Sequence, residues 1–207
     1  MNRGKNVIAA FDLDGTLTER DTFLHLLIRT FGYTGLAKGL WANAFNLVKY
    51  QFGLKSSHDA KEAFFSHFFK GLSVEDFEKL CNIYSLNVLP GLMRKEAVTR
   101  CVWHLERGHQ LVIVSASIRN WIEPWAMSSG FNHVIATEVE VESERITGRF
   151  RGKNCSGDEK VRRFNEVFPE RQNFELYAYG DSQGDEALLK FADHAYYRRF
   201  PISTAKA

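Results

Sequence analysis

The feature that most constrains this chain is a short apolar run that ends in two acids. Residues 7–11 read Val-Ile-Ala-Ala-Phe and precede Asp12-Leu13-Asp14-Gly15-Thr16. Such a run is typical of a strand buried on both faces, and in open α/β sheets ligands bind where the strands end. Carboxylates two residues apart on a strand point the same way, so we expect Asp12 and Asp14 to share a site. Asp-Gly is also a common turn pair, which leaves a purely structural reading open.

Three later segments carry polar residues in similar places. Residues 175–179 predict a strand that leads into Gly180-Asp181-Ser182-Gln183-Gly184-Asp185, and residues 111–114 predict one that ends in Ser115-Ala116-Ser117. The segment 156–160 predicts a helix start, with Ser156 and Glu159 as a capping box. Lys160 would then lie in the first helical turn, where a cation is electrostatically unfavoured. A functional lysine is favoured there, and a solvated surface lysine is the alternative.

The ordered set resembles the four motifs of the haloacid dehalogenase (HAD) superfamily. The matching residues are Asp12-x-Asp14-Gly-Thr, Ser115, Lys160 and Gly-Asp181-Ser-x-Gly-Asp185. The spacing is similar to the phosphoserine-phosphatase-like branch, subfamily IB, whose helical cap lies between the first and second motifs. The pattern Cys155-x-Gly-x-Glu-Lys is similar to that of C-type phosphatidylglycerophosphatases.

The resemblance implies a Mg²⁺-dependent phosphomonoester hydrolase that forms an aspartyl phosphate. Asp12 would be the nucleophile and Asp14 the acid and base. Asp12, Asp14 (through its backbone carbonyl) and Asp181 would hold the metal, with Asp185 behind them. The phosphate-binding residues implied by the resemblance are Ser115, Ala116 and Lys160, and Lys160 would also act in catalysis.

Several alternatives stay open at these positions. Asp185 could simply cap a helix, and Ser115 could serve a turn. The same fold also supports metal-free dehalogenases, phosphotransferases and non-catalytic regulatory proteins. A phosphoserine-phosphatase-type activity is a further alternative. Asp21 could be a substrate-specificity residue, but the matching cap region, residues 61–65, contains no arginine and the cap is rich in phenylalanine. We therefore expect a small phosphorylated metabolite or a lipid phosphate such as phosphatidylglycerophosphate as the substrate.

The strand and helix signals predict an α/β fold, a Rossmann-like doubly wound parallel sheet with an inserted all-helical C1-type cap. Strands are expected at 7–12, 111–115, 133–136, 176–180 and 194–197, and an exposed hairpin at 138–151. Residues 20–90 contain no strand signal and predict four helices, at 22–31, 36–52, 58–69 and 73–86. We therefore assign residues 1–19 and 91–207 to the catalytic core and 20–90 to the cap.

Composition excludes several classes of protein. The net charge of +2 does not indicate a nucleic-acid partner. The three cysteines, Cys81, Cys101 and Cys155, form no CxxC pair, which argues against a disulfide framework or a zinc site. The polar start of the chain does not resemble a signal peptide, so a cytoplasmic location is expected. The oligomeric state is not indicated.

One cap segment allows two interpretations. Leu40, Trp41, Ala44, Phe45, Val48 and Phe52 form an apolar face, with Lys38 and Lys49 among the residues opposite. The segment is too polar to span a membrane. It could pack within the cap, in which case Trp41 would be buried, or it could rest on a membrane surface as a peripheral contact.

Overall fold

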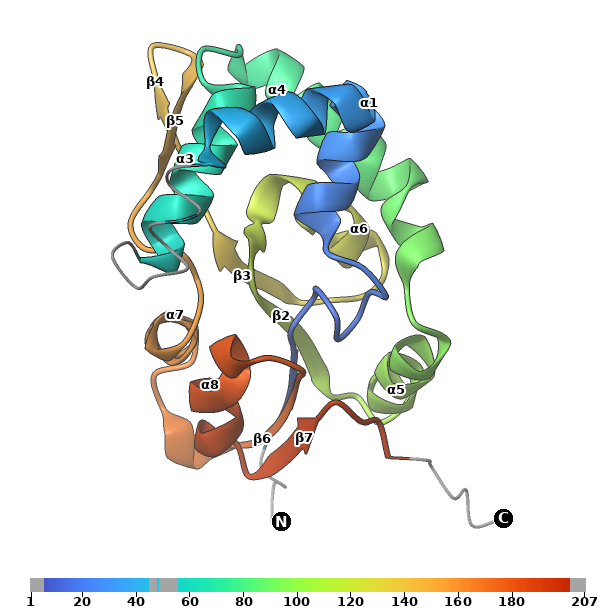
Figure 1. The fold of residues 1–207 in the computed structure, drawn as a ribbon. Helices are drawn as coiled ribbons and strands as arrows, with labels where there is room; N and C mark the ends of the chain where they lie inside the picture. The colour runs from blue at the N-terminus through green and yellow to red at the C-terminus, as the bar shows by residue number, and fades with distance from the viewer. Residues whose placement is uncertain (1–5, 45–47, 49–55, 202–207) are drawn as a thin grey trace, which may run out of the picture.

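The computed structural model describes residues 6–44, 48 and 56–201. The sheet contains five parallel strands in the order β3-β2-β1-β6-β7 (Figure 1). Their bounds are β1 Asn6–Phe11, β2 Gln110–Ile118, β3 His133–Thr137, β6 Phe174–Gly180 and β7 His194–Tyr197. All five predicted strands are present in one sheet, and the predicted fold class is confirmed.

The side chains of the central strand, β1, belong to hydrophobic clusters on both faces of the sheet. Along β1, Ala9 and Phe11 belong to one hydrophobic cluster, while Ile8 and Ala10 belong to another. Because successive strand residues point to opposite faces, each cluster lies on its own side of the sheet. Helices α7 (Asp158–Val167) and α8 (Glu186–Phe191) contribute to the second cluster, and α5 (Lys95–Leu105) and α6 (Glu123–Ser128) contribute to the first.

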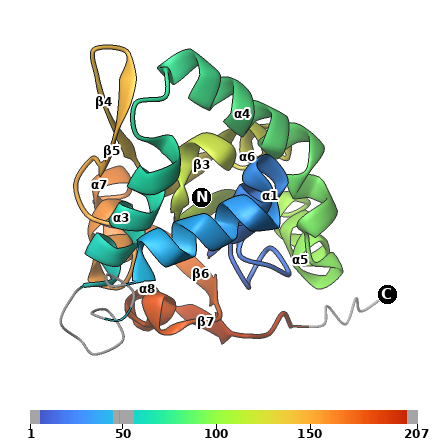
Figure 2. The same ribbon diagram turned by 45° about the horizontal axis from the view of Figure 1, so that its top comes forward.

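Among the described residues of the segment assigned to the cap, three helices lie together at one end of the sheet (Figures 1 and 2). They are α1 (Thr22–Ala42), α3 (Ser57–Phe69) and α4 (Val74–Asn87). The helices expected at 22–31 and 36–52 join into α1 across a kink at Gly32, whose φ of 71° breaks the helical geometry. The later part of the second expected helix falls largely outside the described residues. The division at residues 19/20 and 90/91 remains a prediction.

The hairpin formed by β4 (Val139–Glu142) and β5 (Arg145–Phe150) belongs structurally with these helices. The backbone of Ile146 is hydrogen-bonded to Gly71 and Leu72, and the Phe150 N–H donates to Glu62 Oε2 at 2.7 Å. Ile146 and Phe150 are buried. The hairpin is therefore not exposed on both faces as expected, because one face completes the core of the helical segment.

Candidate active site

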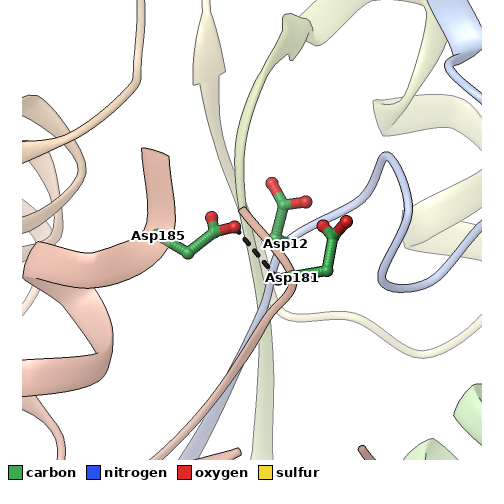
Figure 3. Close-up of side chains that lie close together, drawn as sticks. All are labelled: Asp12, Asp181 and Asp185. Atoms are coloured by element: carbon green, nitrogen blue, oxygen red, sulfur yellow. Dashed lines mark hydrogen bonds between the residues drawn. The ribbon is translucent and has the colours of Figure 1, made fainter. Parts of the chain in front are cut away.

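Three carboxylates converge at the carboxyl edge of the sheet. Asp12 directly follows β1, Asp181 directly follows β6, and Asp185 lies at the start of α8; one oxygen from each lies within 4.8 Å of the others (Figure 3). The adjacency of β1 and β6, in register from Asn6↔Phe174 to Phe11↔Tyr179, brings these distant segments together. The sequence-predicted acids 12, 181 and 185 thus form one cluster.

Lys160 bridges two carboxylates of this cluster, those of Asp12 and Asp185. Its ammonium donates to Asp12 Oδ1 at 2.6 Å, to Asp185 Oδ1 at 2.6 Å and to the Val114 carbonyl at 2.7 Å. The side chain is buried, with 1% of the residue exposed, so it is not a solvated surface lysine. Burial disfavours the ammonium, but the two carboxylates outweigh that cost and hold the pKa of Lys160 well above its ordinary value.

The local structure around Lys160 differs from the sequence expectation. Helix α7 begins at Asp158 after Gly157, whose φ is 61°, and no side chain caps it. Ser156 is therefore not the N-cap, and Glu159 makes ion pairs with Arg162 and Arg163 instead of completing a capping box. Those pairs lower the pKa of Glu159 to about 2. Arg163 also donates to the carbonyl of Ala136 in β3, which fixes the first turn of α7 against the sheet.

Asp12 and Asp185 both bind Lys160, but their pKa values shift in opposite directions. Asp185 Oδ2 accepts hydrogen bonds from the Asp181 and Ser182 amides and the Ser182 hydroxyl. Although burial opposes ionisation of Asp185, these donors and Lys160 hold its pKa below the ordinary value. Burial raises the pKa of Asp12 to about 7, and the charge of Lys160 only partly offsets that effect, with Asp185 and Asp14 nearby. Asp185 therefore stabilises the preceding loop and binds Lys160, whereas its side chain does not cap α8 in the way that the alternative interpretation expected.

The carboxylate of Asp14 contacts residues of α1 and β2. Strand β1 ends at Phe11, so the alternation rule does not extend to Asp14, which lies in the following turn. Its carboxylate accepts from the Thr22 amide at 2.7 Å and from the Ser117 hydroxyl, at the junction of β2 with α1. Burial, and then the charge of Asp21, raise the pKa of Asp14. A carboxyl with a raised pKa is suited to donating a proton.

Ser115 and Ala116 lie beside this junction. Strand β2 continues to Ile118 and does not end at Ser115, with an irregular register between Ser115 and Ile118. The buried Ser115 hydroxyl accepts from the Ser117 amide at 3.0 Å, a local contact within the strand and not in a turn. The carbonyl of Ala116 accepts from Lys61 Nζ at 2.7 Å and from Thr137 Oγ1 at 2.7 Å. Phosphate binding by Ser115 and Ala116 remains a prediction.

Lys61 is a site residue that sequence reasoning missed. It extends from α3 to the carbonyl of Ala116, and the negative charges of Asp14, Asp21 and Asp12 act on its ammonium. Burial lowers the pKa of Lys61. The search for an arginine in this stretch overlooked the lysine that stands there. The sequence feature that could have indicated Lys61 is that it is the one lysine or arginine in a Phe-rich predicted helix.

Asp21 has a clear structural role. Its carboxylate accepts from the Leu24 amide at 2.8 Å and caps α1. The charge of Asp21 also raises the pKa of Asp14. Asp21 thus lies close enough to the site to influence its electrostatics, and its proposed part in substrate selection remains a prediction.

The donor set at the cluster fits a hard divalent cation. Mg²⁺ prefers carboxylate and carbonyl oxygens, and the cluster offers carboxylate oxygens from Asp12 and Asp181. Burial raises the pKa of Asp12, and the positive charge of Lys160 offsets that effect only in part. Asp185 is already engaged by Lys160 and by the loop amides. Asp12 and Asp181 are therefore the carboxylates that would hold the ion, with Asp185 positioning the loop behind them.

Cys155 is close to Lys160 in sequence but is not available as a nucleophile. It is fully buried, and burial raises the pKa of its thiol to about 11. The neutral thiol contacts the carbonyl of Ile135 at 3.8 Å.

Among the residues that the structure describes, no helix combines the length and hydrophobicity needed to cross a bilayer.

Comparisons with known proteins agree with this arrangement. The family model of haloacid dehalogenase-like hydrolases matches residues 9–190. Protein CicA of Caulobacter vibrioides is 33% identical, over 94% of this chain and 86% of the relative. A probable phosphatase of Mycobacterium tuberculosis is 27% identical, over 90% of this chain and 67% of the relative.

Solved structures show the same fold. A protein of unknown function from Bordetella pertussis superposes with a TM-score of 0.77 at 27% identity, covering 90% of this chain and 86% of the other. A substrate-bound phosphoserine phosphatase superposes with a TM-score of 0.60 at 16% identity, covering 92% of this chain and 84% of the other. From the family match and the ordered acids at the sheet edge, we conclude that this chain belongs to the haloacid dehalogenase-like hydrolase family.

Proposed function

We propose that the protein is a Mg²⁺-dependent phosphomonoesterase that works through a phosphorylated Asp12. The observation that carries this proposal is the cluster of Asp12, Asp181 and Asp185 at the carboxyl edge of the sheet, with Lys160 bound to Asp12 and Asp185. The phosphatase name of a relative and the phosphoserine phosphatase fold support the same reaction class. A bound Mg²⁺ would offset the negative charge of Asp12 and the phosphoryl group.

The residues supply the two halves of such a reaction. In the first, an oxygen of Asp12 attacks phosphorus, the bond to the ester oxygen breaks, and Asp14 gives its proton to the leaving alkoxide. In the second, Asp14 takes a proton from water, whose oxygen attacks phosphorus and breaks the bond to Asp12. Inorganic phosphate is released and both side chains are reset. Lys160 stabilises charge on Asp12 and on the transferring group throughout.

The position of Asp14 supports this division of labour. Its carboxylate lies towards Thr22 and Ser117, apart from the cluster formed by Asp12, Asp181 and Asp185. The raised pKa favours the protonated form that the first half-reaction needs. A dehalogenase would have no use for this second acid, and a regulatory protein would have no use for the complete set. A phosphotransferase would use the same residues with another acceptor in place of water.

The cap side of the site favours a leaving group that carries its own negative charge. Lys61 brings a partly desolvated ammonium to the carbonyl of Ala116, near Asp14. The phenylalanines of the helical segment pack mainly against one another: Phe65 and Phe69 have ring centroids 4.9 Å apart, and Phe69 and Phe77 5.3 Å apart. They therefore form the cap core and do not by themselves indicate a bulky apolar substrate. Phosphoserine and phosphatidylglycerophosphate both carry an anionic group beyond the ester phosphate, and both remain candidate substrates.

Peripheral membrane contact through α1 is a second proposal, carried by one observation. Trp41 is 85% exposed, so it does not pack inside the cap as one interpretation expected. Leu40 beside it is also exposed, whereas Phe45 and Phe52 fall outside the described residues. An exposed tryptophan on a helix that also carries Lys38 fits a helix lying on a lipid surface.

The proposed reaction is tested by phosphate release from p-nitrophenyl phosphate, with Mg²⁺ and after chelation. Activity should require the metal, and Asp181→Asn should raise the Mg²⁺ concentration needed for half-maximal rate. Phosphoserine, glycerol phosphate and a phosphatidylglycerophosphate dispersion should then be compared for kcat/KM. Full activity in chelated protein would reject the metal-dependent phosphatase and favour the dehalogenase alternative.

A further inference from the structure

A second pocket lies beside the loop that carries Asp181, and the proposed mechanism does not use it. Its volume is about 360 Å³, and its wall includes Arg94, Arg198, Arg199, Tyr196 and Phe200. The residues that the mechanism uses for the leaving group, Asp14 and Lys61, are not among its lining residues. The pocket therefore adjoins the proposed metal site through Asp181, which is among its lining residues, but lies outside the part of the site that faces the leaving group.

Three arginines line the pocket, and none of them forms an ion pair with a described residue. Within residues 6–44, 48 and 56–201, Arg94, Arg198 and Arg199 form no ion pair with a carboxylate. Arg94 Nε donates to the Thr18 carbonyl at 3.2 Å, and Arg198 Nε donates to the Asp181 carbonyl at 2.7 Å. Each of these bonds uses one donor of a guanidinium that has five. The remaining donors can bind an anion.

The two acids that line the pocket do not cancel this charge. The carboxylate of Asp181 belongs to the cluster with Asp12 and Asp185 and accepts from the Thr16 hydroxyl at 3.1 Å. Glu96 is exposed to solvent at the start of α5. Three arginines against these two acids leave the lining with a formal excess of one positive charge.

The rest of the wall is aromatic. Tyr196 and Phe200 stack on the buried ring of Tyr179, with centroids 4.9 and 5.5 Å away and interplanar angles of 10° and 19°. Tyr196 and Phe200 are themselves only partly buried. Guanidinium groups bind phosphate and carboxylate in a fork geometry, and partly exposed rings favour a planar ligand.

We propose that this pocket binds a small aromatic anion, a phosphate or carboxylate group attached to a planar ring, at a site next to the metal loop that does not include Asp14 or Lys61. Arg94 and Arg199 would hold the anionic group and the aromatic wall would hold the ring. Arg198 would link the ligand to the metal loop, since its amide donates to the Gly180 carbonyl at 2.9 Å and its Nε to Asp181.

The test is calorimetric titration with phenylphosphonate, an aromatic anion whose P–C bond a phosphatase does not hydrolyse. Arg94→Gln and Arg199→Gln should each weaken one binding event by about tenfold or more, because hydrogen bonds to charged groups are worth that much. Arg107→Gln removes the same charge from a guanidinium that stacks on Trp103 at 4.1 Å, outside the pocket, and should leave the affinity unchanged. Methylphosphonate should bind more weakly than phenylphosphonate.

Any binding at the catalytic site does not involve these arginines and would survive in both pocket variants. Thermal unfolding of each variant shows whether it is folded, and the exposed Arg199 makes its variant the safer one. Unchanged phenylphosphonate affinity in folded Arg94→Gln and Arg199→Gln would overturn the proposal, as would the absence of binding to the unmodified protein. Equal affinity for methylphosphonate would overturn the aromatic part of the ligand assignment.

Discussion

Gly15 lies directly against the carboxylate of Asp181: a Cβ atom added at Gly15 would stand 2.4 Å from Asp181 Oδ2. The backbone at Gly15 also has a φ of 83°, which side-chain-bearing residues rarely adopt. The glycine of the first motif therefore lets the loop after β1 close over the acid that follows β6. This contact places the two halves of the proposed metal site together.

Replacing Gly15 by alanine should displace the Asp181 carboxylate and weaken Mg²⁺ binding by about tenfold or more, the loss of roughly 1.4 kcal/mol or more. The measurement is the Mg²⁺-induced rise in unfolding temperature. Gly71→Ala is the matched control, since Gly71 has a φ of 85° but no atom within 4 Å of the added Cβ. Both variants carry the backbone cost of a positive φ, and only the first should lose metal affinity. Equal Mg²⁺ responses would show that the contact does not hold Asp181 in place.

The raised pKa of Asp12 predicts a pH-dependent stability cost in the metal-free protein. The pKa of Asp12 is about 7 in the folded protein and returns to its ordinary value of 3.8 on unfolding. Between these two pH values the folded state therefore binds more protons than the unfolded state. Stability attributable to Asp12 therefore falls as pH rises from about 4 to about 7, by up to about 4 kcal/mol. Asn does not titrate, so the stability of Asp12→Asn relative to the original protein should increase across that range. Urea unfolding in chelator at several pH values measures it, and a pH-independent difference would contradict the assigned shift.

Much of this arrangement was predictable because the signals are local. Residues 7–11 are an unbroken apolar run, and acids follow the predicted strand ends, so the pattern placed Asp12, Asp181 and Asp185 at strand ends. The resemblance to the HAD superfamily then grouped them in one site. The acids are indeed within 4.8 Å of one another. The fold class followed from the alternation of strands and helices in the same way.

The differences from the predictions have both local and long-range causes. Glu159 fits a capping box by spacing, but Arg162 and Arg163 compete for its carboxylate and leave Gly157 at the start of α7. The alternation argument for Asp14 does not apply, because β1 ends at Phe11 and Asp14 lies in the turn that follows. Lys61 was missed because its role depends on α3 lying over the end of β2, a long-range contact that no local pattern encodes.

Lys61 is expected to select substrates by charge. Lys61→Gln should raise KM for a phosphomonoester with an anionic leaving group by about tenfold, as a charge-assisted hydrogen bond is lost, and should leave kcat nearly unchanged. KM for p-nitrophenyl phosphate, which has no second anion, should change little. Lys61→Arg restores the charge and should recover part of the affinity. A uniform rise in KM for all substrates, or a loss of kcat, would indicate that Lys61 only holds α3 on Ala116.

The exposure of Trp41 predicts that replacing it reduces vesicle binding but leaves the stability of the fold nearly unchanged. Because the residue is 85% exposed, Trp41→Ser should change the free energy of unfolding by less than about 0.5 kcal/mol. If α1 rests on lipid, the original protein should float with anionic vesicles, added salt should weaken that association, and Trp41→Ser should reduce it. Absence of flotation by the original protein would reject the membrane contact and leave the phosphatase proposal unaffected.

The central claim is that Asp12 becomes covalently phosphorylated, and trapping that species tests it most directly. The protein should be mixed with Mg²⁺ and excess p-nitrophenyl phosphate, quenched in acid during turnover, and analysed by intact and peptide mass spectrometry. We predict one added phosphoryl group, labile to hydroxylamine, on the peptide that contains Asp12, and none in Asp12→Asn. Continued turnover by Asp12→Asn, or a phosphoryl group on any other residue of the trapped protein, would contradict the account.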